Sequence, residues 1–278
     1  MEKCIRFPGF RYRALTLSYD DGVIYDERLI DTMSAHGIKG TFNLNSGNMP
    51  APGVPSRRFS AEDVRRVYDN PCVEVATHGY NHLEPLHQDI PSFASEMLRD
   101  RLALEQLTGK IVRGMAYAYG GFNKELESVL KTVGITYSRT TRATHGFGIP
   151  ADWLEWHPTC HHNDGELMNL CDRFLSSDGK NDWARMLSNP LIFYVWGHSY
   201  EFNDNNNWEI IEQFCEKMGG HDEIWYATNG EIRDYIEAAR SLVWSMDSTI
   251  VYNPTCTDVY MHLDGKPVLI PAGQTLKL

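Results

Sequence analysis

The sequence predicts an α/β fold in which a mostly parallel sheet closes into a barrel. Short runs rich in β-branched and aromatic residues alternate with helical patterns along most of the chain, which is typical of parallel sheets. Roughly seven or eight such repeats fit a closed barrel better than an open doubly wound sheet, which remains the structural alternative. A chain of 278 residues with 42% apolar residues is long enough for one barrel and a small appendage.

The elements follow from hydrophobic period and from end signals. Strands are expected at residues 14–19, 40–44, 72–77, 113–117, 135–139, 191–196 and 223–227, with a shorter one around 153–157. Helices are expected between them, at 25–36, 61–69, 92–108, 124–133, 165–175, 208–218 and 231–241. Ser60 with Asp63 resembles a capping box, and Gly109, Gly134 and Gly219 stand where helices should stop.

The pattern changes after about residue 242. Short strands are expected at 248–253, 257–263, 267–270 and 274–278, and Asp264-Gly265 predicts a hairpin turn between two of them. We therefore divide the chain into a barrel domain, residues 1–242, and a small β appendage, residues 243–278, packed on the barrel.

Composition excludes several classes of protein. The formal net charge is −11 and no Lys/Arg cluster stands out, so we expect no nucleic-acid partner. No apolar run is long enough to span a membrane, and the six scattered cysteines contain no zinc-knuckle pair. Residues 1–13 have no apolar region of signal-peptide type, so we expect a cytoplasmic protein, although a secreted protein without its leader fits too. Oligomeric state is not predicted.

Polar residues follow four of the expected strands directly. Asp20 and Asp21 follow the first strand, His78 and His82 the third, Tyr119 and Gly120 the fourth, and His198 the run 191–196. Active sites of α/β barrels are built at the carboxyl ends of the strands. Four separate elements would thus converge on one rim.

The chemistry of these residues predicts a metal-dependent hydrolase. Asp21, His78 and His82 make a three-ligand set with open positions, the usual plan of a catalytic divalent ion that activates water. Zinc is the expected metal, and cobalt, manganese or iron would also fit one such site. Asp20 is the candidate general base and His198 the candidate general acid, which together suit hydrolysis of an amide or ester.

Each signal also has an ordinary structural explanation. An HxxxH pair occurs by chance, adjacent aspartates after a strand often cap a helix, and a histidine after an apolar strand is usually structural. Their shared position at strand ends is what favours a site.

The same residues resemble a known family. Ser18-Tyr19-Asp20-Asp21-Gly22 and Thr77-His78-Gly79-Tyr80-Asn81-His82 are similar to the first two metal motifs of the polysaccharide deacetylases, also called the NodB-homology or carbohydrate esterase family 4. Gly40-Thr41-Phe42, Tyr117-Ala118-Tyr119-Gly120-Gly121 and Val195-Trp196-Gly197-His198 resemble further family motifs more loosely. The resemblance covers about residues 14–240.

The resemblance implies a distorted (β/α) barrel of about seven parallel strands and removal of N- or O-acetyl groups from a carbohydrate. It implies that Asp20 is the base, that Asp21, His78 and His82 bind the metal, and that His198 is the acid. It also implies an oxyanion held by the metal and a backbone N–H near Tyr119.

Two departures mark a divergent member. The arginine that orients the base in the family is missing near Ala116, where Arg113, Arg139 or Arg142 are possible substitutes. Asp152-Trp153 is the best match for the fourth motif, with Trp156 as a second aromatic.

Substrate contacts are predicted from aromatic residues near the rim. Tyr119, Gly120, Trp153 and Trp156 are the candidates, and core packing is the alternative for each aromatic ring. Tyr80 and Trp196 lie near the rim too. His157, His161 and His162 form a second histidine cluster that we interpret as loop residues, with a place in the groove or adventitious metal binding as the alternatives.

Two other functions stay open. The missing arginine leaves room for an amidohydrolase of small cyclic amides or ureides, which a groove closed by the loops 49–58 and 163–181 would favour. A catalytically inactive carbohydrate-binding relative is the third possibility, although all five catalytic and metal-ligating residues are present.

Overall fold

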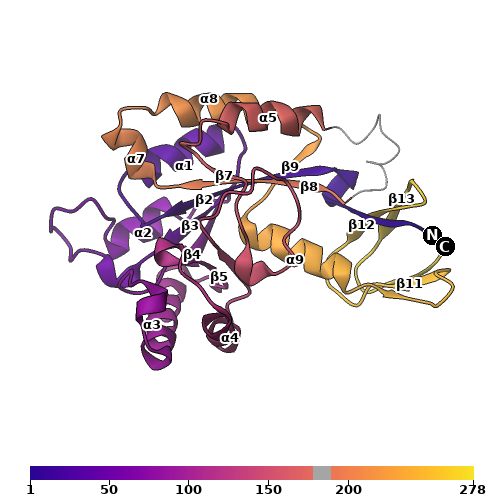
Figure 1. Cartoon of the computed structure of the whole chain (residues 1–278), viewed down its shortest axis with the longest axis horizontal. Coiled ribbons are helices and arrows are strands. Elements are labelled where there is room, and N and C mark those ends of the chain that lie inside the picture. The colour runs from indigo at the N-terminus through magenta and orange to yellow at the C-terminus, as the bar shows by residue number, and fades with distance from the viewer. Residues whose placement is uncertain (178–188) are drawn as a thin grey trace.

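The computed structural model describes residues 1–177 and 189–278, and its centre is one curled sheet of parallel strands (Figure 1). Its strands run in the order β6-β5-β4-β3-β2-β8-β7, and β9 also pairs with β2. They are β2 (Arg13–Asp20), β3 (Gly40–Leu44), β4 (Val73–Thr77), β5 (Gly114–Ala116), β6 (Tyr137–Arg139), β7 (Cys160–His161), β8 (Leu191–Gly197) and β9 (Ile224–Tyr226). The predicted distorted (β/α) barrel is confirmed.

One short segment links the two ends of the sheet. Trp156 forms a parallel bridge with Arg139 of β6, and Cys160 and His161 of the same segment pair with β8. The strand expected at 153–157 was wrong, because Trp153–Glu155 form a turn of 3₁₀ helix in which the Leu154 N–H donates to the side chain of Asp152.

The helices lie on both sides of this sheet. They are α1 (Asp26–Ala35), α2 (Ala61–Val67), α3 (Ile90–Thr108), α4 (Lys124–Thr132), α5 (Leu167–Ser176), α7 (Ser199–Asp204), α8 (Glu209–Met218) and α9 (Asn229–Arg240). In Figure 1, α1, α5, α7 and α8 lie above the sheet and α3 and α4 below it. Ser60 and Asp63 form the predicted capping box of α2. The short helix α7 was not predicted.

The side chains of β2 alternate between an apolar outer face and an inner face that carries Thr16, Ser18 and Asp20. Leu15, Leu17 and Tyr19 of β2 pack in the core that includes α1 and α8. Thr16 donates to Asn229 of α9, and Ser18 accepts from Asn43 at 2.9 Å. Thr16 and Ser18 therefore face the barrel interior. Because side chains alternate with a period of two, Asp20 at the end of β2 also faces inward.

The C-terminal strands form two small antiparallel sheets. One has the order β1-β12-β13 and the other β10-β11-β14. Their bounds are β1 (Lys3–Arg6), β10 (Val243–Trp244), β11 (Ile250–Tyr252), β12 (Val259–Leu263), β13 (Lys266–Ile270) and β14 (Thr275–Lys277). Asp264 and Gly265, both with positive φ, make the predicted hairpin turn. Because β1 joins this sheet, residues from both ends of the chain build it, and the division at residue 242 stays a prediction.

None of the helices in the described ranges combines the length and the apolar character needed to cross a lipid bilayer.

Candidate active site

Four inward-facing side chains meet at the carboxyl ends of the strands. Asp20 follows the inner face of β2, His78 that of β4, Arg139 that of β6 and His198 that of β8. Asp20 Oδ2 lies 3.7 Å from Nε2 of His78 and 3.9 Å from Nε2 of His198, and it pairs with Arg139. Residues distant in sequence therefore share one site at the rim where α/β barrels carry their chemistry.

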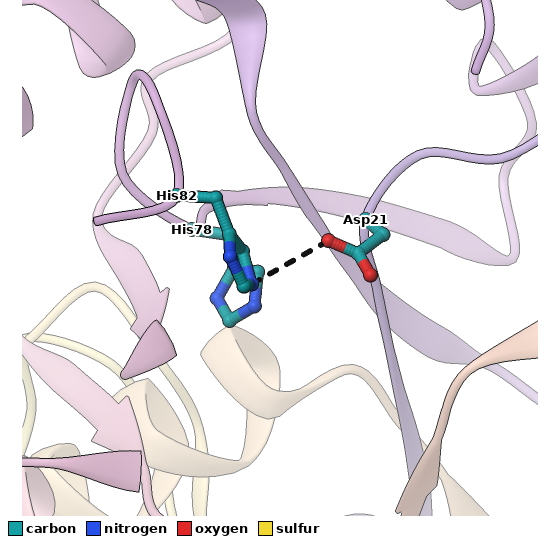
Figure 2. Close-up of side chains that lie close together, drawn as sticks. All are labelled: Asp21, His78 and His82. Carbon is teal, nitrogen blue, oxygen red and sulfur yellow. Dashed lines mark ion pairs between the residues drawn. The ribbon is translucent and has the colours of Figure 1, made fainter. Parts of the chain in front are cut away.

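Asp21, His78 and His82 lie close enough to share one ion. Each offers a ligand atom, and these three atoms lie within 4.8 Å of one another. His82 Nε2 is 3.6 Å from Asp21 Oδ1, and the carboxylate of Asp21 points toward the two imidazoles (Figure 2), whose ring centroids lie 4.8 Å apart. Two imidazoles and one carboxylate are a donor set that zinc and related divalent ions accept.

Hydrogen bonds and burial prepare the two imidazoles to act as ligands. Nδ1 of His78 lies 2.7 Å from the carbonyl oxygen of Ala116, which can only accept, so Nδ1 carries the proton and Nε2 keeps its lone pair. Burial, and then the neighbouring His78, lower the pKa of His82 to about 4, so its ring is neutral at neutral pH. The residues present therefore fit a divalent metal.

Two of the three candidate ligands have a strained backbone. Asp21 has φ +84° and His82 has φ +57°, a left-handed conformation that side chains other than glycine rarely adopt. Arg58 donates to the backbone oxygen of Asp21, and its Nη2 lies 3.2 Å from Oδ1 of the same residue. We infer that Arg58, a residue that the sequence did not single out, holds Asp21 in this conformation.

Helix α3 supports the loop that carries the two histidines. The buried carboxylate of Asp100 accepts from the backbone N–H of Ser46 at 2.7 Å and from that of His78 at 3.3 Å, and it also accepts from Thr77. One helical turn away, Glu96 accepts from the backbone N–H of Asn81 at 2.7 Å and from its side chain at 2.6 Å. These acids, four residues apart on one helix face, fix the turn between His78 and His82.

Asp20 is a buried carboxylate with a partner on each oxygen. Oδ2 pairs with Arg139, and Oδ1 accepts from Nδ2 of Asn43 at 2.8 Å. Burial alone would raise the pKa of Asp20, but Arg139, His78 and His198 outweigh it and lower the pKa to about 2. Asp20 is therefore anionic throughout the neutral range.

Arg139 is the arginine that contacts Asp20, the candidate base. The guanidinium is almost fully buried, pairs with Asp20, and lies 4.1 Å from the ring centroid of Trp196. Of the three possible substitutes, Arg113 pairs instead with Asp234 of α9. The signal in the sequence was the position of Arg139 at the end of an expected strand, but sequence alone could not show which arginine faces inward.

His198 has a carboxylate partner that the sequence did not reveal. Its Nδ1 lies 3.3 Å from Oε1 of Glu201, one turn along α7. Burial would lower the pKa of His198, but Glu201 and Asp20 outweigh it and raise the pKa above its ordinary value. The imidazole is thereby prepared to hold a proton on Nε2, the nitrogen that faces Asp20.

Of the aromatic candidates, Tyr119 lies beside the candidate metal triad. Its side chain is 69% exposed, its ring centroid is 4.7 Å from that of His82, and its φ is +57°. Gly120, with φ +82°, completes this turn against Thr141. Tyr119 is thus an exposed ring next to His82.

The two tryptophans proposed as substrate contacts lie in the core. Trp153 and Trp156 are buried in an aromatic cluster with Tyr137 and Tyr194, and Trp153 Nε1 donates to Glu237 of α9. The carboxylate of Asp152 lies 3.3 Å from Nζ of Lys124. We therefore correct the fourth-motif assignment, since ordinary packing explains both rings. Of the loop 163–181 proposed to close a groove, residues 178–181 lie outside the described residues.

The rim of this α/β barrel thus brings together a candidate base, Asp20, a candidate acid, His198, and the candidate metal triad. The family model of polysaccharide deacetylase matches residues 10–138, which confirms the resemblance over that part of the chain. A chitin deacetylase of Pestalotiopsis sp is 27% identical over 119 residues, 42% of this chain and 38% of that protein, so the chain matches well under half of this relative.

Solved structures extend the likeness of fold. A putative polysaccharide deacetylase from Mycobacterium smegmatis is 15% identical, covers 85% of this chain and 94% of its own, and has a TM-score of 0.60. The Xyl-CE4 domain of a multidomain xylanase from the hindgut metagenome of Trinervitermes trinervoides is 17% identical, covers 81% and 92%, and has a TM-score of 0.51. At these identities the likeness shows the fold alone.

Proposed function

We propose that the protein is a metal-dependent deacetylase that removes N- or O-acetyl groups from a carbohydrate. The observation that carries the proposal is the convergence of Asp20, His198 and the triad of Asp21, His78 and His82 on one rim. The family match over residues 10–138 and the chitin deacetylase relative support a carbohydrate as the substrate class.

Asp21, His78 and His82 would hold one divalent ion, with zinc preferred by the two-imidazole, one-carboxylate donor set. The chemistry that such an ion would supply there is polarisation of the acetyl carbonyl and a lowered pKa of a neighbouring water. Asp20, anionic and fixed by Arg139 and Asn43, takes a proton from the attacking water.

His198 completes the reaction from the other side. Its Nε2 gives a proton to the leaving nitrogen or oxygen as the acyl bond breaks, while Glu201 on Nδ1 balances the charge of the imidazolium. A backbone N–H near Tyr119 stays the proposed second contact for the negative carbonyl oxygen, and the exposed ring of Tyr119 is placed to stack on a sugar.

The position of Arg139 bears on the cyclic-amide alternative. That alternative rested on an unpartnered base, and Arg139 supplies the partner from β6. The retention of all five catalytic and metal-ligating residues likewise favours an active enzyme over a binding module.

Acetate release from acetylated chitooligosaccharides and acetylated xylan, with and without added zinc, tests the proposal. We expect His78→Ala to lose both metal and turnover, and Asp20→Asn to keep the metal but lose turnover. Gln274→Ala, a change at an exposed loop residue of the C-terminal β-strands, is the control. Full activity of Asp20→Asn would remove its role as base, and a metal content unchanged in His78→Ala would refute the metal site.

A further inference from the structure

Next to His198, the proposed acid, lies a second group of two histidines and one carboxylate. His161 and His162 follow each other at the end of β7, and Glu201 comes from α7. Their ligand atoms, like those of the first triad, all lie within 4.8 Å of one another. The donor set, two imidazoles and one carboxylate, is that of the triad Asp21, His78 and His82.

The distances between these atoms suit a shared ion. Glu201 Oε2 lies 3.2 Å from Nε2 of His161 and 2.9 Å from Nε2 of His162. Ligands about 2.0–2.2 Å from a tetrahedral zinc are separated from one another by roughly 3.3 Å. Both distances from the carboxylate oxygen to the imidazole nitrogens are thus near the spacing that one coordinated ion imposes, and all three atoms lie within 4.8 Å of one another.

The burial of His162 gives independent support. Its side chain is fully buried, and within the described residues neither ring nitrogen has a hydrogen-bond partner. The oxygen of Glu201 is close to Nε2 but lies off the direction in which an N–H would donate. A buried polar ring without a partner is costly, and a coordinated cation at Nε2 would satisfy it.

We propose that His161, His162 and Glu201 form a second divalent-cation site, separate from the triad of Asp21, His78 and His82. The remaining metal-like group, Glu127 with Asp152 and Glu155, differs because Lys124 already lies within 3.3 Å of each of its three carboxylates. Among the described residues, no lysine or arginine side chain forms an ion pair with Glu201 in the group of His161, His162 and Glu201.

Two contacts make this site weaker than the first. Nδ1 of His161 accepts from the backbone N–H of Asn163 at 3.1 Å, and coordination through Nε2 would put a proton on Nδ1 and break that bond. Asn163 Nδ2 also lies 3.5 Å from Glu201 Oε2. By contrast, Nδ1 of His78 already faces a carbonyl, so the first site needs no such change. We therefore expect the triad of Asp21, His78 and His82 to bind its ion at a lower free zinc concentration than the second site.

An ion at the second site would act on His198 through the carboxylate of Glu201. Oε1 of Glu201 lies 3.3 Å from Nδ1 of His198, while Oε2 faces His161 and His162. If His198 is the acid of the proposed function, an ion on Oε2 withdraws the negative charge that supports it. Excess zinc should then inhibit turnover.

Metal binding tests the site without any need for activity. Equilibrium dialysis against a buffered zinc series, with elemental analysis, should give two ions per wild-type chain, the second at higher free zinc. His161→Ala removes a part-exposed ligand, and His162→Phe keeps a ring between Tyr19 and Phe202, with which His162 stacks. Each should lose the weaker ion and keep the tighter one.

The outcomes separate this proposal from the proposed function. His78→Ala should lose the tighter ion and keep the weaker, and His145→Ala, a nearby exposed histidine paired with Asp164, should bind both. Wild-type binding of a single ion that His78→Ala abolishes would overturn the second site and leave the first intact. Unchanged binding in both His161→Ala and His162→Phe would also overturn it, as would an equal loss in His145→Ala.

Discussion

Replacing Arg139 by Met should turn Asp20 from a stabilised carboxylate into a destabilising one. In the native protein the pKa of Asp20 is lowered from 3.8 to about 2. At about 1.4 kcal/mol per unit, this difference contributes about 2 kcal/mol of stability. Because the folded pKa is the lower one, that stability is present above pH 4 and is lost as the pH falls toward 2.

Met fills much of the volume of Arg139 but carries no charge. Asp20 then stays buried with only Asn43 and two histidines around it, and burial raises its pKa above the unfolded value. Removing one partner of a buried ion pair costs roughly 3–5 kcal/mol. Urea unfolding of chelator-treated protein at pH 7 should show a loss of this size, and the variant should regain stability as the pH is lowered and Asp20 takes up a proton.

A double-mutant cycle separates the charge from the packing. In an Asp20→Asn background the change Arg139→Met should cost much less, because no buried anion remains. Arg139→Lys is the matched control that keeps a cation. An equal loss in the presence and absence of the Asp20 charge would refute the reasoning and assign the effect to lost contact with Trp196.

Further predictions concern the acid, the rim and the core. Glu201→Gln removes the anion that raises the pKa of His198, so the fall of kcat at high pH should move to lower pH; an unmoved profile contradicts the pairing. Tyr119→Ala should raise KM for an oligosaccharide about fivefold, worth about 1 kcal/mol of stacking, with Tm unchanged, and an unchanged KM would remove its substrate role. Burial raises the pKa of Asp26 to about 7, although hydrogen bonds from Ser199 and Tyr68 oppose the shift. Because the folded pKa is the higher one, the native protein loses stability as the pH rises from 4 to 7. Asp26→Asn should therefore have a higher Tm than wild type at pH 8 but not at pH 4, and a constant difference between the two would contradict the shift.

Local patterns determined most of the elements. Alternating runs and turn residues placed the long strands and helices within a few residues, and Asp264-Gly265 gave the C-terminal hairpin. Errors fell where local preference is weak: Trp153–Glu155 lies in a turn because Asp152 caps it, and β1 forms only because β12 lies beside it. Strands of few residues depend on their partners, and no single-sequence pattern reports a partner.

The sequence by itself determined the residue types of the site and their shared position at strand ends, because the His-x-x-x-His spacing and the paired aspartates are local features. The tertiary structure decided which distant side chains complete that site. Arg139 reaches Asp20 across the barrel, Glu201 reaches His198, and Asp100 reaches the loop of His78. It also placed Trp153 and Trp156 in the core, because burial depends on what packs against a ring. Such contacts join elements far apart in sequence, so only the folded chain shows them.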